Sequence, residues 1–322
     1  MSTSISSFAE LLAPVEQSAF FKTSWERQPL HICHRPAGFY DGLLTASDVE
    51  AAIVSGGLRY PAVQLAREGG FYPPEAFTRS TRSGGDVFAG IPDLDRLRAE
   101  YAAGATISLP GFHRAWKLLG ELAAAIEAEF DHPVHTNVYI TPGNASGFTP
   151  HYDTHEVFVL QIAGGKRWRI EKPPLPLPHR SQPFDPRSYR PSPPLLEVEL
   201  SPGDLLYLPR GFVHSTVTTS DRASVHVTLG VTVYTWVELF AEWAQLSRHN
   251  PNLRRALPPA FASREGRPQP LGEQLRQAIT ELQQLTDYDT FLDGFSQRVR
   301  AGRARGQPDF DIDVTATPRA SR

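Results

Sequence analysis

Two short segments of the sequence carry side chains that can bind one transition metal together. His151-Tyr152-Asp153 places an imidazole and a carboxylate two positions apart, and His214 supplies a second imidazole further along the chain. In a β-strand, side chains two positions apart face the same side, so His151 and Asp153 can converge on one ion. Two imidazoles and one carboxylate leave the opposite face of the ion open, a pattern typical of non-haem Fe(II) oxygenases.

The surroundings of the third ligand support this interpretation. The apolar run 205–208 predicts a buried strand that ends shortly before His214, and Pro209 and Gly211 predict a turn between them. A histidine and an aspartate at this spacing arise often by chance, and a lone histidine in an apolar strand is usually a hydrogen-bonded core residue. Zinc can take the same three ligands. The neighbouring sequence therefore has to decide between these alternatives.

Long stretches around these residues resemble the JmjC-type cupin family, which includes the bacterial ribosomal oxygenases. The resemblance is strongest over HTNVYITPGNASGFTPHYDTHEVFVLQIAGGKRWRI (135–170) and LSPGDLLYLPRGFVHSTVTTSDRASVHVTLGV (200–231). It extends to FKTSWERQPLHI (21–32) and NLRRALPPAF (252–261), and so covers most of residues 15–265. The family implies an α+β protein built on a double-stranded β-helix of the jelly-roll or cupin type. It also implies Fe(II) chemistry that uses 2-oxoglutarate and O2 to hydroxylate a substrate.

The resemblance assigns roles to individual residues. It implies three metal ligands: His151, Asp153 and His214. It also implies five residues in the cosubstrate pocket: Lys166, Asn137, Tyr139, His226 and Thr228. Lys166 would pair with the distal carboxylate of 2-oxoglutarate through a charge-assisted hydrogen bond. For the other four, ordinary hydrogen bonding in the core is the alternative.

The residues beside the predicted site have simpler expected roles. The Ala163-Gly164-Gly165 turn predicts that the strand of Lys166 returns antiparallel to the strand of His151. Arg167 should then face away from the pocket and Trp168 towards it. His155, two positions after Asp153, is a candidate substrate contact at the pocket mouth. The remaining histidines without ligand spacing are expected to be structural or on the surface: His113, His132, His135, His179 and His249.

The composition is that of an ordinary globular protein. Of the 322 residues, 40% are hydrophobic and 21% charged, and the formal net charge of -3 gives no general attraction to nucleic acid phosphates. The single cysteine, Cys33, excludes an internal disulfide framework. The first residues lack the pattern of a signal peptide, and no apolar run approaches the length of a membrane span. We therefore expect a cytoplasmic protein.

The pattern along the chain, taken with the resemblance, predicts four regions: accessory helices and loops (1–104), the cupin domain (105–240), a helical dimerisation region (241–300) and a flexible tail (301–322). Periodicity and capping residues predict helices over 8–21, 47–55 and 112–130. Residues 68–94 have the composition of ordered loops beside a pocket. The proline-dense stretch 173–196 cannot form a central strand and is expected to be a surface loop or a cover over the pocket mouth.

Two amphipathic helices are predicted after the core, over 236–248 and 271–285. The resemblance implies that such helices mediate homodimerisation, while packing against the protein's own barrel is the alternative. The candidate residues for either contact are Trp236, Leu239, Phe240, Trp243, Leu275, Ile279, Leu282 and Leu285. The best-known ribosomal oxygenases carry a winged-helix domain after these helices. About the last forty residues of this chain are too few for one, which weakens the transfer of a ribosomal substrate.

The first functional hypothesis is therefore an Fe(II)- and 2-oxoglutarate-dependent hydroxylase that acts on a side chain of a protein or peptide. A second hypothesis is hydroxylation of a free amino acid or natural-product intermediate at the same iron site. A third is a non-catalytic cupin that serves as a dimeric adaptor, and a fourth is a zinc or manganese isomerase or hydrolase that needs no 2-oxoglutarate. The sequence identifies neither the target residue nor whether the product is an alcohol or a demethylated group.

Overall fold

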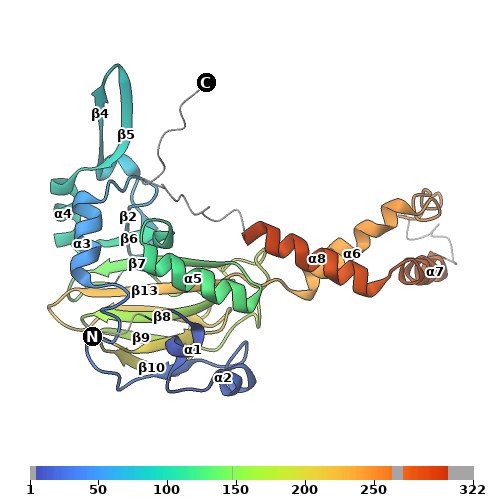
Figure 1. Ribbon diagram of the computed structural model, residues 1–322, viewed down its shortest axis with the longest axis horizontal. Helices are drawn as coiled ribbons and strands as arrows, with labels where there is room; N and C mark the ends of the chain where they lie inside the picture. The colour runs from blue at the N-terminus through green and yellow to red at the C-terminus, as the bar shows by residue number, and fades with distance from the viewer. Residues whose placement is uncertain (1–4, 147, 263–270, 304–322) are drawn as a thin grey trace, which may run out of the picture. The chain divides into compact units, whose positions relative to one another are not determined.

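The structure is a computed structural model that describes residues 5–146, 148–262 and 271–303. The chain divides into two compact units, Met1–Val233 and Tyr234–Arg322. The first unit contains the strands and the predicted metal-binding residues, and the second is helical (Figure 1). Most of the predicted tail, from residue 304 on, lies outside the described residues.

The main sheet of the first unit has eight strands in the order β1-β11-β8-β13-β7-β6-β2-β3, and every pairing in it is antiparallel. Two of its inner strands, β11 and β8, are mostly apolar because both of their faces are covered. All residues of β8 are buried except Ala163. The strands are β1 (Leu30–Ile32), β11 (Leu205–Leu208), β8 (Glu156–Ala163), β13 (Ser224–Val231), β7 (Val134–Thr141), β6 (Thr106–Pro110), β2 (Gln64–Arg67) and β3 (Gly70–Phe71).

A second sheet packs against the first and closes the double-stranded β-helix. It has the order β10-β9-β12, with β10 at Pro194–Leu200, β9 at Lys166–Glu171 and β12 at Val213–Thr218. Apolar side chains from both sheets fill the space between them, among them Val159 of β8 and Ile170 of β9. The site described below lies within this two-sheet core.

The connection between β8 and β9 corrects one prediction. Residue Lys166 does not lie on a strand that pairs with the segment of His151, because β9 pairs with β10 and β12 in the second sheet. Gly164 adopts a left-handed conformation (φ +64°), and a Cβ there would lie 2.0 Å from the carbonyl oxygen of Ala223. The glycine turn therefore carries the chain from one sheet to the other instead of forming a hairpin.

Helices cover part of the main sheet. Helix α5 (Lys117–Phe130) packs against β7 through its buried stripe, which includes Leu119 and Ile126 (Figure 1). The predicted helix over 112–130 is confirmed from Lys117 on, and the residues before it form the short 3-10 helix η2 (Phe112–Arg114). The predicted helix over 47–55 is confirmed as α3 (Ala46–Ser55), which Thr45 caps. Helix α4 (Leu94–Ala102) lies next to it in the accessory region (Figure 1).

Two predictions for the accessory region were wrong in part. The helix expected over 8–21 is split into α1 (Phe8–Leu12) and α2 (Gln17–Thr23), because Pro14 has no amide hydrogen to continue the helix. The stretch 68–94, expected to be loops, contains η1 (Pro74–Ala76) and a projecting hairpin of β4 (Thr78–Ser83) and β5 (Asp86–Pro92) (Figure 1). Gly84 and Gly85, both with positive φ, form its tight turn.

The second unit consists of α6 (Trp236–Gln245), η3 (Leu246–His249), α7 (Leu271–Gln284) and α8 (Tyr288–Arg303). The two predicted helices are therefore confirmed, and α8 was not predicted. The Trp243 indole donates a hydrogen bond to the Thr286 hydroxyl over 2.7 Å, which ties α6 to the end of α7. Among the helices of the described ranges, none is both long and apolar enough to cross a bilayer.

Candidate active site

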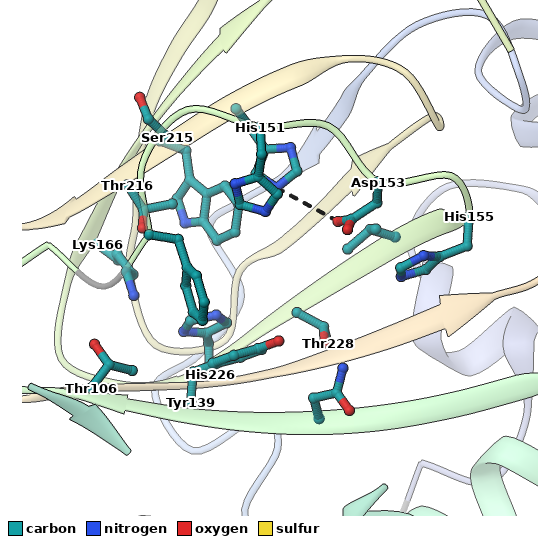
Figure 2. A pocket seen from close by; sticks show the side chains of 15 residues that line it. Thr106, Tyr139, His151, Asp153, His155, Lys166, Ser215, Thr216, His226 and Thr228 are labelled. Carbon is teal, nitrogen blue, oxygen red and sulfur yellow. Dashed lines mark ion pairs between the residues drawn. The ribbon is translucent and has the colours of Figure 1, made fainter. Parts of the chain in front are cut away.

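Three side chains converge at one end of the two-sheet core. His151 and Asp153 precede β8, and His214 lies in β12. One ligand atom from each of them lies within 4.8 Å of the others, and His214 Nε2 is 3.7 Å from Asp153 Oδ2 (Figure 2). The structure thus brings together the three residues that the sequence singles out as metal ligands.

Main-chain hydrogen bonds set the spacing of these ligands. His151 does not lie in a regular strand but forms an isolated antiparallel bridge with His214. The His151 amide donates to the His214 carbonyl over 3.2 Å, and the His214 amide donates back over 2.8 Å. The Gly211 amide donates to the Asp153 carbonyl over 3.0 Å. The two ligand segments are therefore joined by their backbones.

The protonation of the three side chains fits a divalent metal. His151 Nδ1 lies 2.8 Å from the Thr149 carbonyl and His214 Nδ1 lies 3.1 Å from the Phe212 carbonyl, so each Nδ1 carries the hydrogen and each Nε2 keeps its lone pair. Burial lowers the pKa of His214 to about 4, and this keeps the imidazole neutral. Burial also opposes ionisation of Asp153, but the neighbouring imidazoles, His155 first, outweigh it and lower the pKa of the carboxyl. Two imidazoles that present Nε2 and one carboxylate are a suitable donor set for Fe(II).

Lys166 occupies a buried position at the start of β9 with little to balance its charge. Its side chain is 2% exposed, and Nζ donates to the Thr141 hydroxyl over 2.9 Å. Within the described residues, no carboxylate lies within ion-pair distance of this ammonium. Burial lowers the pKa of Lys166 to about 7. A carboxylate of a bound ligand would supply the missing counter-charge.

The other predicted pocket residues line the same cavity as the metal ligands and Lys166. Asn137 pairs with Thr228 and Tyr139 with His226 across β7 and β13. The rings of Tyr139 and His226 stack with centroids 5.1 Å apart. His226 Nδ1 is buried and has no hydrogen-bond partner in the described part of the chain. An orphaned polar atom beside an unbalanced lysine indicates space for a polar ligand.

Sequence reasoning missed some residues of this cavity. Phe148, Thr106, Ser215 and Thr216 also line it. Thr141, the hydrogen-bond partner of Lys166, continues the inward series Asn137, Tyr139, Thr141 at two-residue spacing, so the strand period could have found it. Thr106 was harder to predict because it lies on β6, and the sequence does not show that β6 pairs with β7. In the sheet the Thr106 hydroxyl lies 3.1 Å from the Thr141 hydroxyl.

The proline-dense stretch packs behind the ligands and is not part of the cavity wall. Tyr152 points away from the metal ligands, and its hydroxyl donates to the Gln182 carbonyl over 3.1 Å. A Cβ on Gly211 would lie 2.7 Å from the Leu175 carbonyl oxygen, so the loop also abuts the turn before His214. The proline-dense stretch therefore supports both ligand segments on the side that faces away from the cavity.

A buried ion-pair network anchors the turn that leads to His214. The Arg210 guanidinium donates to Glu156 Oε1 over 2.7 Å and also pairs with Glu26. The Tyr207 hydroxyl donates to the second oxygen of Glu156. Burial raises the pKa of Glu156 to about 7. Since Arg210 compensates this buried carboxylate, it fixes the end of β11 immediately before the ligand-bearing strand.

The structure also places other residues that the sequence analysis singled out beside the site. Arg167 is exposed, and Trp168 points into the cavity. His155 lines the cavity beyond Asp153, and His135 lies behind it. His113 Nδ1 accepts a hydrogen bond from the Thr136 amide over 3.1 Å, which is a structural role.

Comparison with known proteins gives relatives over most of the chain. Residues 112–239 match the JmjC domain family. Ribosomal oxygenase 1 of Rattus norvegicus is 30% identical over 264 residues, which are 79% of this chain and 42% of that protein. Ribosomal oxygenase 2 of the same species is 36% identical over 231 residues, 69% of this chain and 46% of that protein. The bifunctional lysine-specific demethylase and histidyl-hydroxylase NO66 of Drosophila pseudoobscura is 29% identical over 69% of this chain and 22% of that protein. The chain thus spans less than half the length of these three relatives.

Solved structures show the same fold. The crystal structure of the ribosomal oxygenase YcfD from Escherichia coli superimposes with a TM-score of 0.54 at 17% identity, over 95% of this chain and 74% of that one. A YcfD complex with cobalt and 2-oxoglutarate gives a TM-score of 0.55 at 16% identity, over 96% and 75% of the two chains. The cupin-type fold predicted from the sequence is confirmed.

Proposed function

We propose, from the match of residues 112–239 to the JmjC domain family, that the protein is an Fe(II)- and 2-oxoglutarate-dependent oxygenase that hydroxylates a side chain of a protein or peptide. One observation carries the proposal: the three converging ligand atoms and the buried, unbalanced Lys166 line a single cavity. A metal hydrolase needs the first of these features but has no use for the second.

The residues of the cavity have distinct tasks in this function. His151, Asp153 and His214 would hold Fe(II), which together with 2-oxoglutarate supplies the activation of O2 for oxidation of a C–H bond. Lys166 would pair with the distal carboxylate of 2-oxoglutarate, and His226 Nδ1 offers that cosubstrate a further polar contact. The rings of Tyr139 and Trp168 both contact the His226 ring and would help to exclude water from the space between Lys166 and the metal ligands.

The names of the relatives favour a protein substrate. Two are called ribosomal oxygenases and one a histidyl-hydroxylase and lysine-specific demethylase. We therefore place hydroxylation of a free amino acid or natural-product intermediate second. Incubation of the Fe(II)-loaded enzyme with a digest of cellular protein and with a pool of free metabolites, followed by mass spectrometry for added oxygen, separates the two.

Anaerobic titration tests the iron chemistry directly. The purified protein is loaded with Fe(II) and then with 2-oxoglutarate, and the visible charge-transfer absorption of the chelate is followed. The band should appear in the parent protein and be lost in His151→Ala, while His249→Ala, an exposed histidine of the second unit, should retain it. Binding of Fe(II) without a 2-oxoglutarate band would reject the oxygenase in favour of a metal isomerase or a non-catalytic adaptor.

We also propose that the helices of the second unit form a homodimer. Apolar side chains on α6 and α7 remain open to solvent, with Trp236 70% and Leu275 61% exposed, whereas Leu282 is buried within the unit. Such a set of exposed apolar residues is typical of an interface, and a second copy of the chain is the occupant we propose.

Analytical ultracentrifugation measures whether the protein is a monomer or a dimer. Trp236→Ser with Phe240→Ser should convert a dimer to a monomer, whereas Val54→Ser, an exposed aliphatic residue of the first unit, should leave the dimer intact. A monomeric parent protein, or a double variant that stays dimeric, would contradict the proposal.

A further inference from the structure

The short strand β3 carries a large aromatic side chain that the fold leaves mostly in water. Phe71 is 60% exposed, and β3 is the last strand of the main sheet. Its one ring contact with the described residues is to Phe148, with centroids 5.8 Å apart and planes at 61°. This contact joins the edge of the main sheet to the segment that precedes His151.

Phe148 lines the cavity that contains the metal ligands. Its ring contacts the ring of Tyr139 and that of the ligand His151, at centroid distances of 5.6 and 5.9 Å. Tyr139 and His151 lie on opposite sides of the cavity (Figure 2), so the Phe148 ring spans the space between them. A shift of this ring would therefore change the shape of the cavity beside His151.

The turn before β3 makes a second contact with the same segment. Glu68 and Gly69 connect β2 to β3, and both have positive φ (50° and 82°), as a type I′ turn requires. A Cβ on Gly69 would lie 2.5 Å from Thr149 Oγ1 and 3.3 Å from the Thr149 amide nitrogen. The Thr149 carbonyl oxygen in turn lies 2.8 Å from His151 Nδ1. Gly69 thus packs against the residue whose carbonyl orients a ligand imidazole.

We propose that the β2–β3 hairpin positions the segment 148–151 for metal and cosubstrate binding. Gly69 holds Thr149, and through its carbonyl the first ligand imidazole, while Phe71 holds the Phe148 ring at the cavity. Neither Gly69 nor Phe71 lines the cavity, so both are positioning residues that act through others. The cosubstrate part of this inference rests on the proposed function and deepens it, because it assigns control of the cosubstrate space to a hairpin outside the two-sheet core.

Titration with Co(II) tests the contact at Gly69. Cobalt accepts imidazole and carboxylate donors, its visible d–d absorption reports the ligand geometry, and the titration needs no cosubstrate. Gly69→Ala should weaken Co(II) binding about tenfold and change the shape of the band, because it disturbs the outer partner of a ligand histidine. Gly84→Ala is the matched control, since Gly84 also has a positive φ (58°) in a hairpin turn, but a Cβ there would meet no atom within 4 Å. This control should bind Co(II) like the parent protein.

A double-mutant cycle tests the contact at Phe71, with calorimetry of 2-oxoglutarate binding to the Co(II) protein. Phe71→Ser should raise the Kd about fivefold, because an unsupported Phe148 ring has to be ordered when the ligand binds. Phe148→Leu removes this ring, and in that background Phe71→Ser should have no further effect. Phe71→Tyr keeps the aromatic contact and should bind like the parent protein. Val87→Ser changes a side chain of β5 that is also 60% exposed, and it should leave the Kd unchanged.

The outcomes separate the positioning role from the proposed function. Parent-like Co(II) binding in Gly69→Ala, or an equal loss in Gly84→Ala, would overturn the positioning of the ligand. A parent-like Kd in Phe71→Ser, or an effect that persists in the Phe148→Leu background, would overturn the positioning of the ring. If the Fe(II) and 2-oxoglutarate band fails to form in the parent protein but Gly69→Ala alone weakens Co(II) binding, the proposed function is wrong and the positioning of the ligand stands.

Discussion

Replacing Lys166 by methionine should have opposite effects on folding and on cosubstrate binding. Methionine keeps most of the volume of the lysine side chain but removes its charge. In the folded protein this charge is buried, and its one described hydrogen bond is to the neutral hydroxyl of Thr141. The buried charge of Lys166 therefore lowers the stability of the free protein and raises its affinity for a ligand that carries a carboxylate.

The stability effect follows from the pKa of Lys166. Burial lowers it from 10.5 to about 7, a difference that corresponds to ~5 kcal/mol of unfavourable charge burial. Because the unfolded chain binds the proton more tightly, this cost is fully present below about pH 7 and fades as the pH rises towards 10.5. After allowance of about 1 kcal/mol for the lost hydrogen bond, Lys166→Met should stabilise the fold by roughly 2–4 kcal/mol at neutral pH. The gain should shrink to near zero at about pH 10.

The binding effect has the other sign. A charge-assisted hydrogen bond between the ammonium and a carboxylate is worth about 1.5–3 kcal/mol, so the Kd for 2-oxoglutarate should rise roughly 10- to 150-fold in Lys166→Met. Since the free lysine loses its proton above about pH 7, affinity of the parent protein should fall with rising pH, and the variant should lack that dependence.

Urea unfolding at two pH values and 2-oxoglutarate titration of the Fe(II) protein measure both effects. Lys172→Met, a change at an exposed lysine beyond the end of β9, is the matched control and should leave both quantities unchanged. A variant that is destabilised at neutral pH would refute the account of Lys166 as an unbalanced buried charge. Unchanged affinity for 2-oxoglutarate would remove it from the cosubstrate site.

Three further changes test other parts of the structure. Asp153→Asn should abolish Fe(II) binding and turnover while circular dichroism stays native, and the exposed Asp95→Asn should keep both. Arg210→Met leaves Glu156 buried without its guanidinium and should cost about 3–5 kcal/mol. This loss should be larger at pH 8 than at pH 5 in chemical denaturation, because burial raises the pKa of Glu156 to about 7 and only the charged form needs a partner. Gly164→Ala combines a positive φ with a steric clash and should lower stability by about 3 kcal/mol in the same measurement; a value near zero would mean that the turn can rearrange.

The family resemblance assigned the four pocket residues that lie on regular strands. Asn137 and Tyr139 on β7, and His226 and Thr228 on β13, stand two positions apart, which agrees with one face of each strand, and β7 and β13 pair along their whole length. His151 and Asp153 share a side although their segment forms only an isolated bridge. Two residues of extended chain are enough for that alternation.

The sequence could not predict features that depend on which strands become neighbours. A glycine turn before Lys166 is compatible with a hairpin or with a crossing to the facing sheet, and only the packing of Gly164 against Ala223 decides between them. The contact of His135 with His155 arises because β13 lies between β7 and β8 in the main sheet. His135 was therefore expected to be structural or on the surface, and neither its spacing nor its type indicated that it lies behind a cavity wall.

The reciprocal main-chain bridge between His151 and His214 separates metal binding from folding. Its two hydrogen bonds, and the third from Gly211 to Asp153, join main-chain atoms only and use none of the side-chain atoms that would bind the ion. Metal uptake then requires little reorganisation, so the affinity for the ion is not spent on ordering the chain. We therefore expect a chelator to remove the ion proposed for this site while leaving the architecture of the protein in place.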